Sequence, residues 1–457
     1  MNIFTFQKFL RLRPFDVSTE KGRSDERYRL AFLSMATNLL SRSVAMLVMV
    51  LTVSLTIPYL GAERFGVWMT VASFVGMLSF LDLGVGNALT NKVSQVASKK
   101  NTEELRRTIS GGLGFLFVLG CSIGVLLLGV ANVLPWTKVI KVKSSIVSGE
   151  ILDVLVVFCV IFGLSLFVNG IQRVFAGLQR SYEAHLVSLL GSCLSILALW
   201  FAAKQEAAIP YLLLATFGVQ TLVNLILLVI LANRNLFTVK RIMDYIRLES
   251  SHLMRVGGLF LILQIGIMVG WGADSLIVAS ALGAAKVAEF AIIQRLFQLV
   301  TQPMNVMNAP LWGAYADAHS KGDKKFIQKT LKRSLMFTGI FSFIGVAIIL
   351  LVGKRLVEIW TGSVLEVSLV LLLAYGVWAI FDAFGNALGV FLNGCSVMKP
   401  QIFTTVIFAL CSLPIKYIMA SVYGIPSMMV AQTIIFVALT YFFCGIIFRE
   451  KLNEVLR

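Results

Sequence analysis

The stretch MATNLLSRSVAMLVMVLTVSLTI, residues 35–57, is the clearest indication of the fold class of this chain. It is apolar enough to lie in a bilayer, because a helix of about 20 apolar residues crosses a hydrocarbon core of about 30 Å. Similar windows recur from about residue 30 to residue 448. Hydrophobic residues make up 58% of the chain and charged residues 14%, which would expose too much apolar surface in a soluble domain. We therefore predict an all-α polytopic membrane protein.

Counting the apolar windows gives about twelve transmembrane helices. An even number of spans places both termini on the same side of the membrane. The predicted spans are 30–58, 64–90, 108–132, 150–172, 183–203, 208–232, 256–281, 286–313, 332–353, 365–393, 399–421 and 425–448.

Lysine and arginine placement orients these spans. Of the 40 lysines and arginines, 29 fall in the termini and in the loops on the same side, and 8 fall in the opposite loops. Cytoplasmic loops carry the excess of basic residues in membrane proteins. Both termini are therefore expected to be cytoplasmic. The net charge of +17 follows from this bias, so it calls for no nucleic-acid partner, and it attracts anionic membrane lipid.

Short internal matches indicate a duplication. Leu60-Gly61-Ala62 and Leu282-Gly283-Ala284 follow the first and seventh spans, and Gly177 aligns with Gly394 near the fourth and tenth. Two six-helix lobes are a common result of such repeats in transporters. The predicted parts are a cytoplasmic N-terminal segment (1–29), an N-lobe of helices 1–6 (30–232), a cytoplasmic linker (233–255), a C-lobe of helices 7–12 (256–448) and a cytoplasmic tail (449–457).

Several kinds of chemistry find no support in the motifs. The sequence contains no GxxxxGK[ST] phosphate loop and no Asp-x-Asp pair, and its six cysteines and three histidines lack metal-ligand spacing. A membrane glycan polymerase or ligase would normally need long external loops that bear arginine or histidine. The external loops here are short, which disfavours that function. We expect no catalytic residue, no metal site and no cofactor.

Polar residues inside the spans are the candidate functional positions. Span 1 carries Asn38 and Arg42 on one helical face, and span 8 carries a stripe of amides. Such stripes either line a cavity or bond between helices, and the number of amides on span 8 favours a cavity wall. Gln264 stands 222 positions after Arg42. The candidate binding residues are Asn38, Arg42, Gln264, Gln294, Arg295, Gln298, Asn305 and Asn308.

The charged residues within the spans are expensive to insert. An arginine at the bilayer centre costs roughly 2.5–3.5 kcal/mol on insertion scales. Arg42 lies about 18 Å from the cytoplasmic end of its span, at 1.5 Å per residue, which is too deep for comfortable snorkelling. Asp274 and Lys416 come at matched depths, about 8–10 Å from the outer face, so we expect them to be paired directly or through water. The candidates for ion pairing or ion coupling are Asp82, Asp274, Asp382 and Lys416.

Three stretches of the sequence resemble those of a known family. The stretch IPYLGAERFGVWMTVASFVGMLSFLDLGVGNALTNKVS (57–94) is similar to the first-to-second span region of O-antigen-type polysaccharide flippases. These belong to the multidrug/oligosaccharidyl-lipid/polysaccharide exporter superfamily. DSLIVASALGAAKVAEFAIIQRLF (274–297) and PLWGAYADAHSKGD (310–323) resemble its seventh and eighth spans. The resemblance implies two lobes around a central cavity that opens alternately to each side.

The resemblance also implies a cargo, an oligosaccharide on a polyprenyl diphosphate carrier. Arginine suits the diphosphate oxygens, because its guanidinium fork binds phosphate in a bidentate manner. We expect a flippase of the bacterial inner membrane whose partners are this lipid-linked oligosaccharide, membrane lipid, a coupling ion (proton or sodium) and other polysaccharide-assembly proteins. One alternative is a multidrug cation antiporter of the same fold, and another is a glycan polymerase or ligase.

The charge asymmetry predicts the topology. Reporters fused after residues 100, 180, 245, 325 and 457 should all report the cytoplasm, and fusions after 62, 140, 205 and 284 should report the periplasm. Alkaline phosphatase and green fluorescent protein fusions measure the two sides. A periplasmic signal after residue 245 would contradict the twelve-span arrangement.

Overall fold

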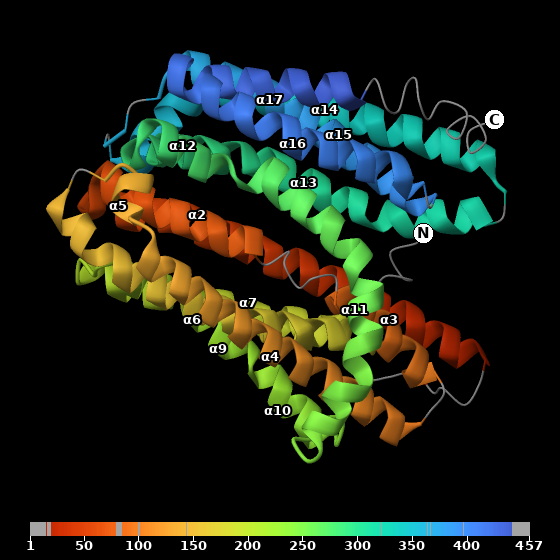
Figure 1. Ribbon diagram of the computed structural model, residues 1–457. Coiled ribbons are helices and arrows are strands. Elements are labelled where there is room, and N and C mark those ends of the chain that lie inside the picture. The colour runs from red at the N-terminus through yellow and green to blue at the C-terminus, as the bar shows by residue number, and fades with distance from the viewer. Residues whose placement is uncertain are drawn as a thin grey trace. The chain divides into compact units, whose positions relative to one another are not determined.

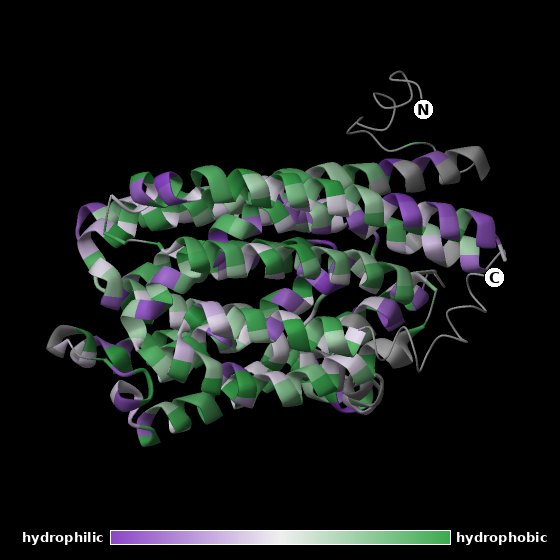
Figure 2. Cartoon of the chain, turned by 90° about the horizontal axis from the view of Figure 1, so that it is seen from above, coloured by the Kyte–Doolittle hydropathy of each residue, from purple (hydrophilic) through white to green (hydrophobic). Residues whose placement is uncertain are grey.

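The computed structural model describes residues 15, 20–78, 85–98, 101–142, 144–320, 322–362, 364–365, 367–395 and 397–440. Within these residues the chain is helical and no strand occurs, so the predicted all-α class is confirmed. Eight of the described helices are long and apolar enough to cross a membrane by length and composition. Hydrophobic residues predominate along the helices (Figure 2). Helices satisfy every backbone hydrogen bond internally, which a bilayer requires.

Contacts divide the chain into two compact units. The first contains residues Met1–Thr52, Leu78–Leu134 and Leu152–Gln264. Its core is formed by leucine, valine and phenylalanine side chains such as Leu89, Leu113 and Phe175. Its helices in chain order are α2 (Glu20–Leu78, as far as Thr52), α3 (Val85–Ser98), α4 (Thr102–Val133), α6 (Ser145–Gly177, from Leu152), α7 (Ser181–Lys204), α8 (Ile209–Leu213), the π-helix η1 (Leu214–Gly218), α9 (Val219–Asn224), α10 (Ile226–Asn233) and α11 (Ile242–Ile267, as far as Gln264).

The second unit contains residues Val53–Met77, Pro135–Ile151 and Ile265–Arg457. Helix α13 packs against α14 and α15, and α16 packs against α17 (Figure 1). Its further elements are the end of α2, α5 (Trp136–Val139), the π-helix η2 (Met268–Gly272), α12 (Asp274–Leu282), α13 (Ala284–Ser320), α14 (Lys324–Thr361), α15 (Leu369–Gly394), α16 (Met398–Tyr423) and α17 (Ile425–Thr440). The predicted lobe boundaries, 30–232 and 256–448, stay a prediction.

Single glycines form sharp corners in the chain: Gly61 interrupts α2, and Gly283 joins α12 to α13. Gly61 has φ 69° and ψ 177°, and Gly283 has φ 94° and ψ 165°. This region of backbone space is essentially restricted to glycine. The two Leu-Gly-Ala motifs that indicated a duplication therefore adopt the same backbone conformation. Gly177 and Gly394 also match, because each is the last residue of its helix, α6 and α15.

The linker between the predicted lobes is held against α4 by small residues and charge. Thr238 donates its backbone N–H to Ser110 Oγ at 3.0 Å, and a Cβ on Gly111 would come within 2.6 Å of the Tyr245 carbonyl oxygen. Glu249 on α11 is buried, with a side chain that is 2% exposed. It pairs with Lys92 on α3 and, at 3.4 Å, with Arg107 on α4. The first part of α11 is thus fastened to α3 and α4.

Removing the Glu249 charge should loosen this attachment. Glu249→Gln is expected to destabilise the protein by about 1–3 kcal/mol, the usual range for a lost charge-assisted hydrogen bond. Thermal unfolding of the purified protein measures this as a lower melting temperature. Glu103→Gln, which changes an exposed carboxylate at the start of α4, is the matched control and should leave the melting temperature unchanged. Equal melting temperatures for the two variants would contradict the role given to Glu249.

Candidate functional site

The seventh predicted span contains a break in its α-helical hydrogen bonding. A π-turn at Met268–Gly272 separates α11 from α12. Such turns disturb the α-helical pattern of backbone bonding and are frequent at functional sites. Gly270 lies within this turn, and a Cβ there would approach the Phe408 ring of α16 to 2.9 Å. The glycine therefore allows α16 to lie close to the turn.

A buried ion pair occupies this close contact. Lys416 on α16 has a side chain that is 0% exposed, and its Nζ lies 2.6 Å from Oδ1 of Asp274. The same ammonium donates to the Gly270 carbonyl oxygen at 2.8 Å. Asp274 is itself buried. Because each charge alone would be very costly in this environment, the two side chains neutralise one another.

Aromatic side chains surround the ion pair. The Trp271 ring lies 4.5 Å from that of Phe408 between centroids, and Phe436 on α17 contacts both rings edge to face. Lys416 Nζ lies 5.9 Å from the centre of the Phe408 ring. These rings reduce the access of water and lower the local dielectric, which strengthens the attraction within the pair.

A second carboxylate stands beside this pair. Asp382 on α15 accepts a hydrogen bond from the Trp271 side chain and lies within electrostatic range of Asp274. Tyr375, one to two turns earlier on α15, hydrogen-bonds to Gln294 on α13. The structure thus brings together three of the predicted charged residues, Asp274, Asp382 and Lys416. We refer to these three residues as the charge cluster.

The amides of the eighth predicted span do not all behave alike. Asn308 is buried, donates to Asn386 Oδ1 at 3.3 Å and accepts from Ser334 Oγ at 3.2 Å. These bonds tie α13 to α14 and α15, so this amide connects helices, and we leave it out of the binding site proposed below. Four other polar residues of the stripe are partly exposed: Gln294, Arg295, Gln298 and Asn305. Of these, Gln294 also links two helices through its hydrogen bond with Tyr375 on α15.

Arg42 has a different environment. Its side chain is exposed, and its Nε donates to Asn38 Oδ1, one turn earlier on α2, at 3.1 Å. His185 on α7 lies within electrostatic range of the guanidinium. Further along α2, Thr52 and Thr56 are buried. The polar side chains of this helix are thus packed near Thr52 and Thr56 and accessible around Arg42.

Two predicted residues cannot be placed, because Asp82 and the side chain of Gln264 lie outside the described residues. Sequence reasoning also missed Trp271 and Tyr375. A weak signal for Trp271 exists in the order Gly270-Trp271-Gly272, since glycines on both sides of an aromatic residue within a span weaken a regular helix.

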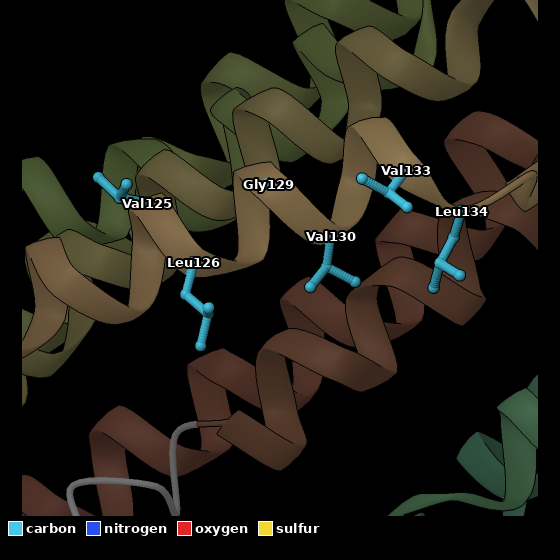
Figure 3. A pocket seen from close by; sticks show the side chains of 6 residues that line it. All are labelled: Val125, Leu126, Gly129, Val130, Val133 and Leu134. Atoms are coloured by element: carbon cyan, nitrogen blue, oxygen red, sulfur yellow. The ribbon is translucent and has the colours of Figure 1, made fainter.

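A shallow groove on α4 has no polar lining. Leu126, Val130 and Leu134 project from one side of the helix (Figure 3), and Val125 and Val133 are strongly exposed. Such a surface suits lipid tails and offers no hydrogen-bond partner for a sugar. The groove is therefore no candidate for glycan binding.

Comparisons with known proteins agree with this architecture. A family model described as polysaccharide biosynthesis protein matches residues 31–311, and a second, MatE, matches residues 261–418. A solved structure of a multidrug resistance MATE family transporter of the MOP superfamily, in an inward-facing conformation, is similar with TM-score 0.72 and 16% identity, covering 92% of this chain and 95% of that one. No curated protein matches.

Another similar structure is a MOP superfamily transporter from Pyrococcus furiosus Vc1 (DSM3638), described by the reverse polarity of its binding pocket. Its TM-score is 0.66 at 14% identity, with 94% of this chain and 96% of that chain covered. At such identities the likeness shows the fold, and the predicted class of about 12 transmembrane helices in two lobes is confirmed.

The ion pair predicts a double-mutant result. Asp274→Asn alone leaves the Lys416 ammonium buried without a counter-charge, and breaking a buried pair typically costs about 3–5 kcal/mol. The amount of folded protein in detergent, measured by size-exclusion chromatography, should fall sharply. Asp274→Asn with Lys416→Met should recover part of it, while Asp244→Asn, at an exposed carboxylate, should have no effect. A double variant no better than the single one would show that the two charges are not coupled.

Proposed function

The chain belongs to the polysaccharide biosynthesis protein family, and we propose that it carries a polyprenyl-diphosphate-linked oligosaccharide across the bacterial inner membrane by alternating access. The family match covers residues 31–311, which extend from the first predicted span to near the end of the eighth. The proposal places the chain among transporters of the MOP superfamily whose cargo is an anion with a large polar sugar.

The observation that carries the proposal is the exposure of the Arg42 side chain and its bond to a neutral partner. Among the described residues its hydrogen-bond partner is an amide oxygen, Asn38 Oδ1, so its positive charge is retained. A charged side chain within a span avoids lipid and faces the protein interior or a water-filled cavity. An exposed arginine at this depth therefore supports a hydrated cavity wall. Its planar fork matches the oxygens of a diphosphate.

Side chains on α13 supply the further groups that such a cargo needs. Arg295 offers a second guanidinium, and the partly exposed amides Gln294, Gln298 and Asn305 can donate to and accept from sugar hydroxyls. Asn38 extends the same chemistry on α2. Contact between the cargo and these side chains, or Gln264, stays a prediction.

A multidrug cation antiporter is the second candidate function. The MatE match over residues 261–418 favours it, and so do the carboxylates Asp274 and Asp382 within that range. Against it, Asp274 is already neutralised by Lys416, and Arg42 would repel a cationic drug. Export of ethidium from cells that express the protein separates the two functions, since the glycan flippase should give no drug resistance.

Transport against a gradient requires energy. The sequence has no nucleotide-binding phosphate loop, so we propose that an ion gradient, of protons or sodium, drives the cycle. The charge cluster of Asp274, Asp382 and Lys416 is the candidate coupling site, and Asp82 is a further candidate. Other polysaccharide-assembly proteins would supply and consume the cargo.

Substitutions at Arg42 test the proposed role in cargo binding. Arg42→Ala should leave the protein folded and inserted but abolish glycan export, because the diphosphate loses its partner. Arg42→Lys should keep part of the activity, since the charge stays while the bidentate fork is lost. Arg42→Glu should be inactive through repulsion. Surface polysaccharide, measured on gels in a host that lacks its own copy of the gene, gives the readout.

Arg333→Ala is the matched control, because Arg333 is an exposed arginine near the start of α14, outside the predicted membrane centre. It should export normally. Immunoblots of the membrane fraction establish that each variant is present in equal amount. Normal export by Arg42→Ala, or its failure only because the protein disappears from the membrane, would make Arg42 a structural residue and contradict the proposal.

A further inference from the structure

The oxygens around the Lys416 ammonium resemble those of a site for a small metal cation. Nζ lies 2.6 Å from a carboxylate oxygen of Asp274 and 2.8 Å from the carbonyl oxygen of Gly270. Carboxylate, backbone carbonyl and hydroxyl oxygens are the ligands that hard cations prefer. The π-turn contributes here, because it presents the Gly270 carbonyl to α16.

Further buried oxygens lie on the helices that form this region. Ser412 stands one turn before Lys416 on α16, is 0% exposed, and its Oγ has no hydrogen-bond partner within the described residues. Gln432 on α17, a helix that packs against α15 and α16, is equally buried, and both atoms of its amide are unpaired in the same described part of the chain. Buried polar groups normally have partners, so these atoms call for an explanation.

We propose that Lys416 is a covalently attached cation that fills a sodium-type site formed by the Asp274 carboxylate and the Gly270 carbonyl. This inference rests on the proposed function in one respect: the charge cluster is the candidate coupling site, and sodium is the coupling ion that Lys416 excludes from it. A metal ion cannot enter while the ammonium holds these two oxygens, so this site does not bind sodium in the native protein. The groups that face the ammonium or its carboxylate are Asp382 and Tyr375 on α15, with Trp271 beside them.

The charges of the cluster lead to the same conclusion. Two carboxylates, Asp274 and Asp382, lie within electrostatic range of one another, and the Lys416 ammonium pairs with Asp274. Replacing Lys416 by an uncharged residue leaves a buried carboxylate without a cation, and a sodium ion can restore the balance in the space that the side chain leaves. A carboxylate that forms no cation site would give no such response, because sodium and choline salts at equal ionic strength screen its charge alike.

Thermal unfolding of the purified protein in detergent tests the proposal without any cargo. Melting temperatures are measured in sodium chloride and in choline chloride at equal ionic strength. The wild-type protein should melt at the same temperature in both salts. Lys416→Ala should melt roughly 2–4 °C higher in sodium chloride, with a saturating dependence on sodium concentration, because a ligand that binds only the folded state stabilises it. Direct binding of radioactive sodium to the same variant is the second measurement.

Two control variants make the test specific. Asp274→Asn with Lys416→Ala lacks the carboxylate and should lose the response to sodium. Lys354→Ala, which removes an exposed lysine on α14, should behave as the wild type. If Lys416→Ala can be purified only in sodium chloride, the proposal is supported.

Three results would overturn the proposal. These are a sodium response in the wild type, a folded Lys416→Ala variant with none, and a variant that sodium fails to rescue at any concentration. Loss of glycan export in Arg42→Ala has no bearing on these measurements. Failure of the flippase assignment and failure of the sodium-site inference are therefore distinguishable.

Discussion

Hydrocarbon solvates neither a backbone amide nor a charge, and this constraint governs the structure. Each unsatisfied backbone group in the bilayer costs several kcal/mol, so the described residues form helices with very short connections. The corners at Gly61 and Gly283 reverse the chain direction with one glycine each, which keeps the unpaired backbone to a minimum. Where the helix is interrupted, at Met268–Gly272, the Gly270 carbonyl receives the Lys416 ammonium as a partner.

The all-α class and the approximate limits of several helices, such as α7 and α16, could be predicted from the sequence, because a bilayer requires long apolar segments that local composition reveals. The predicted span 64–90 differs from the structure, since α3 begins at Val85 and continues to Ser98. The placement of Asp274 and Lys416 followed from depth alone, since two charges at equal depth in an apolar medium favour contact. The two Leu-Gly-Ala motifs indicated a duplication, and the structure adds that their glycines share a backbone conformation that few other residues adopt.

Other features depend on packing that one sequence does not show. The π-turn needs a tertiary partner for its carbonyl, and that partner, Lys416, lies 146 positions away. Asn308 and the remaining amides of its helix look alike in sequence, yet only the neighbouring Ser334 and Asn386 make Asn308 an interhelical link. Glu249 lies in the predicted linker (233–255), and its burial against Lys92 and Arg107 arises from the fit of α11 on glycines of α4.

A charged side chain within a span is costly, and Arg42 and Lys416 avoid this cost in different ways. Lys416 is fully buried and its charge is neutralised by Asp274. Arg42 keeps its charge, bonds to a neutral amide and stays exposed. Arginine cannot shed its proton inside a protein, and an exposed arginine in a span therefore requires water or an anion beside it. Under the proposed function, the charge that serves stability and the charge that serves cargo binding lie on different helices, so a substitution can alter one without disturbing the other.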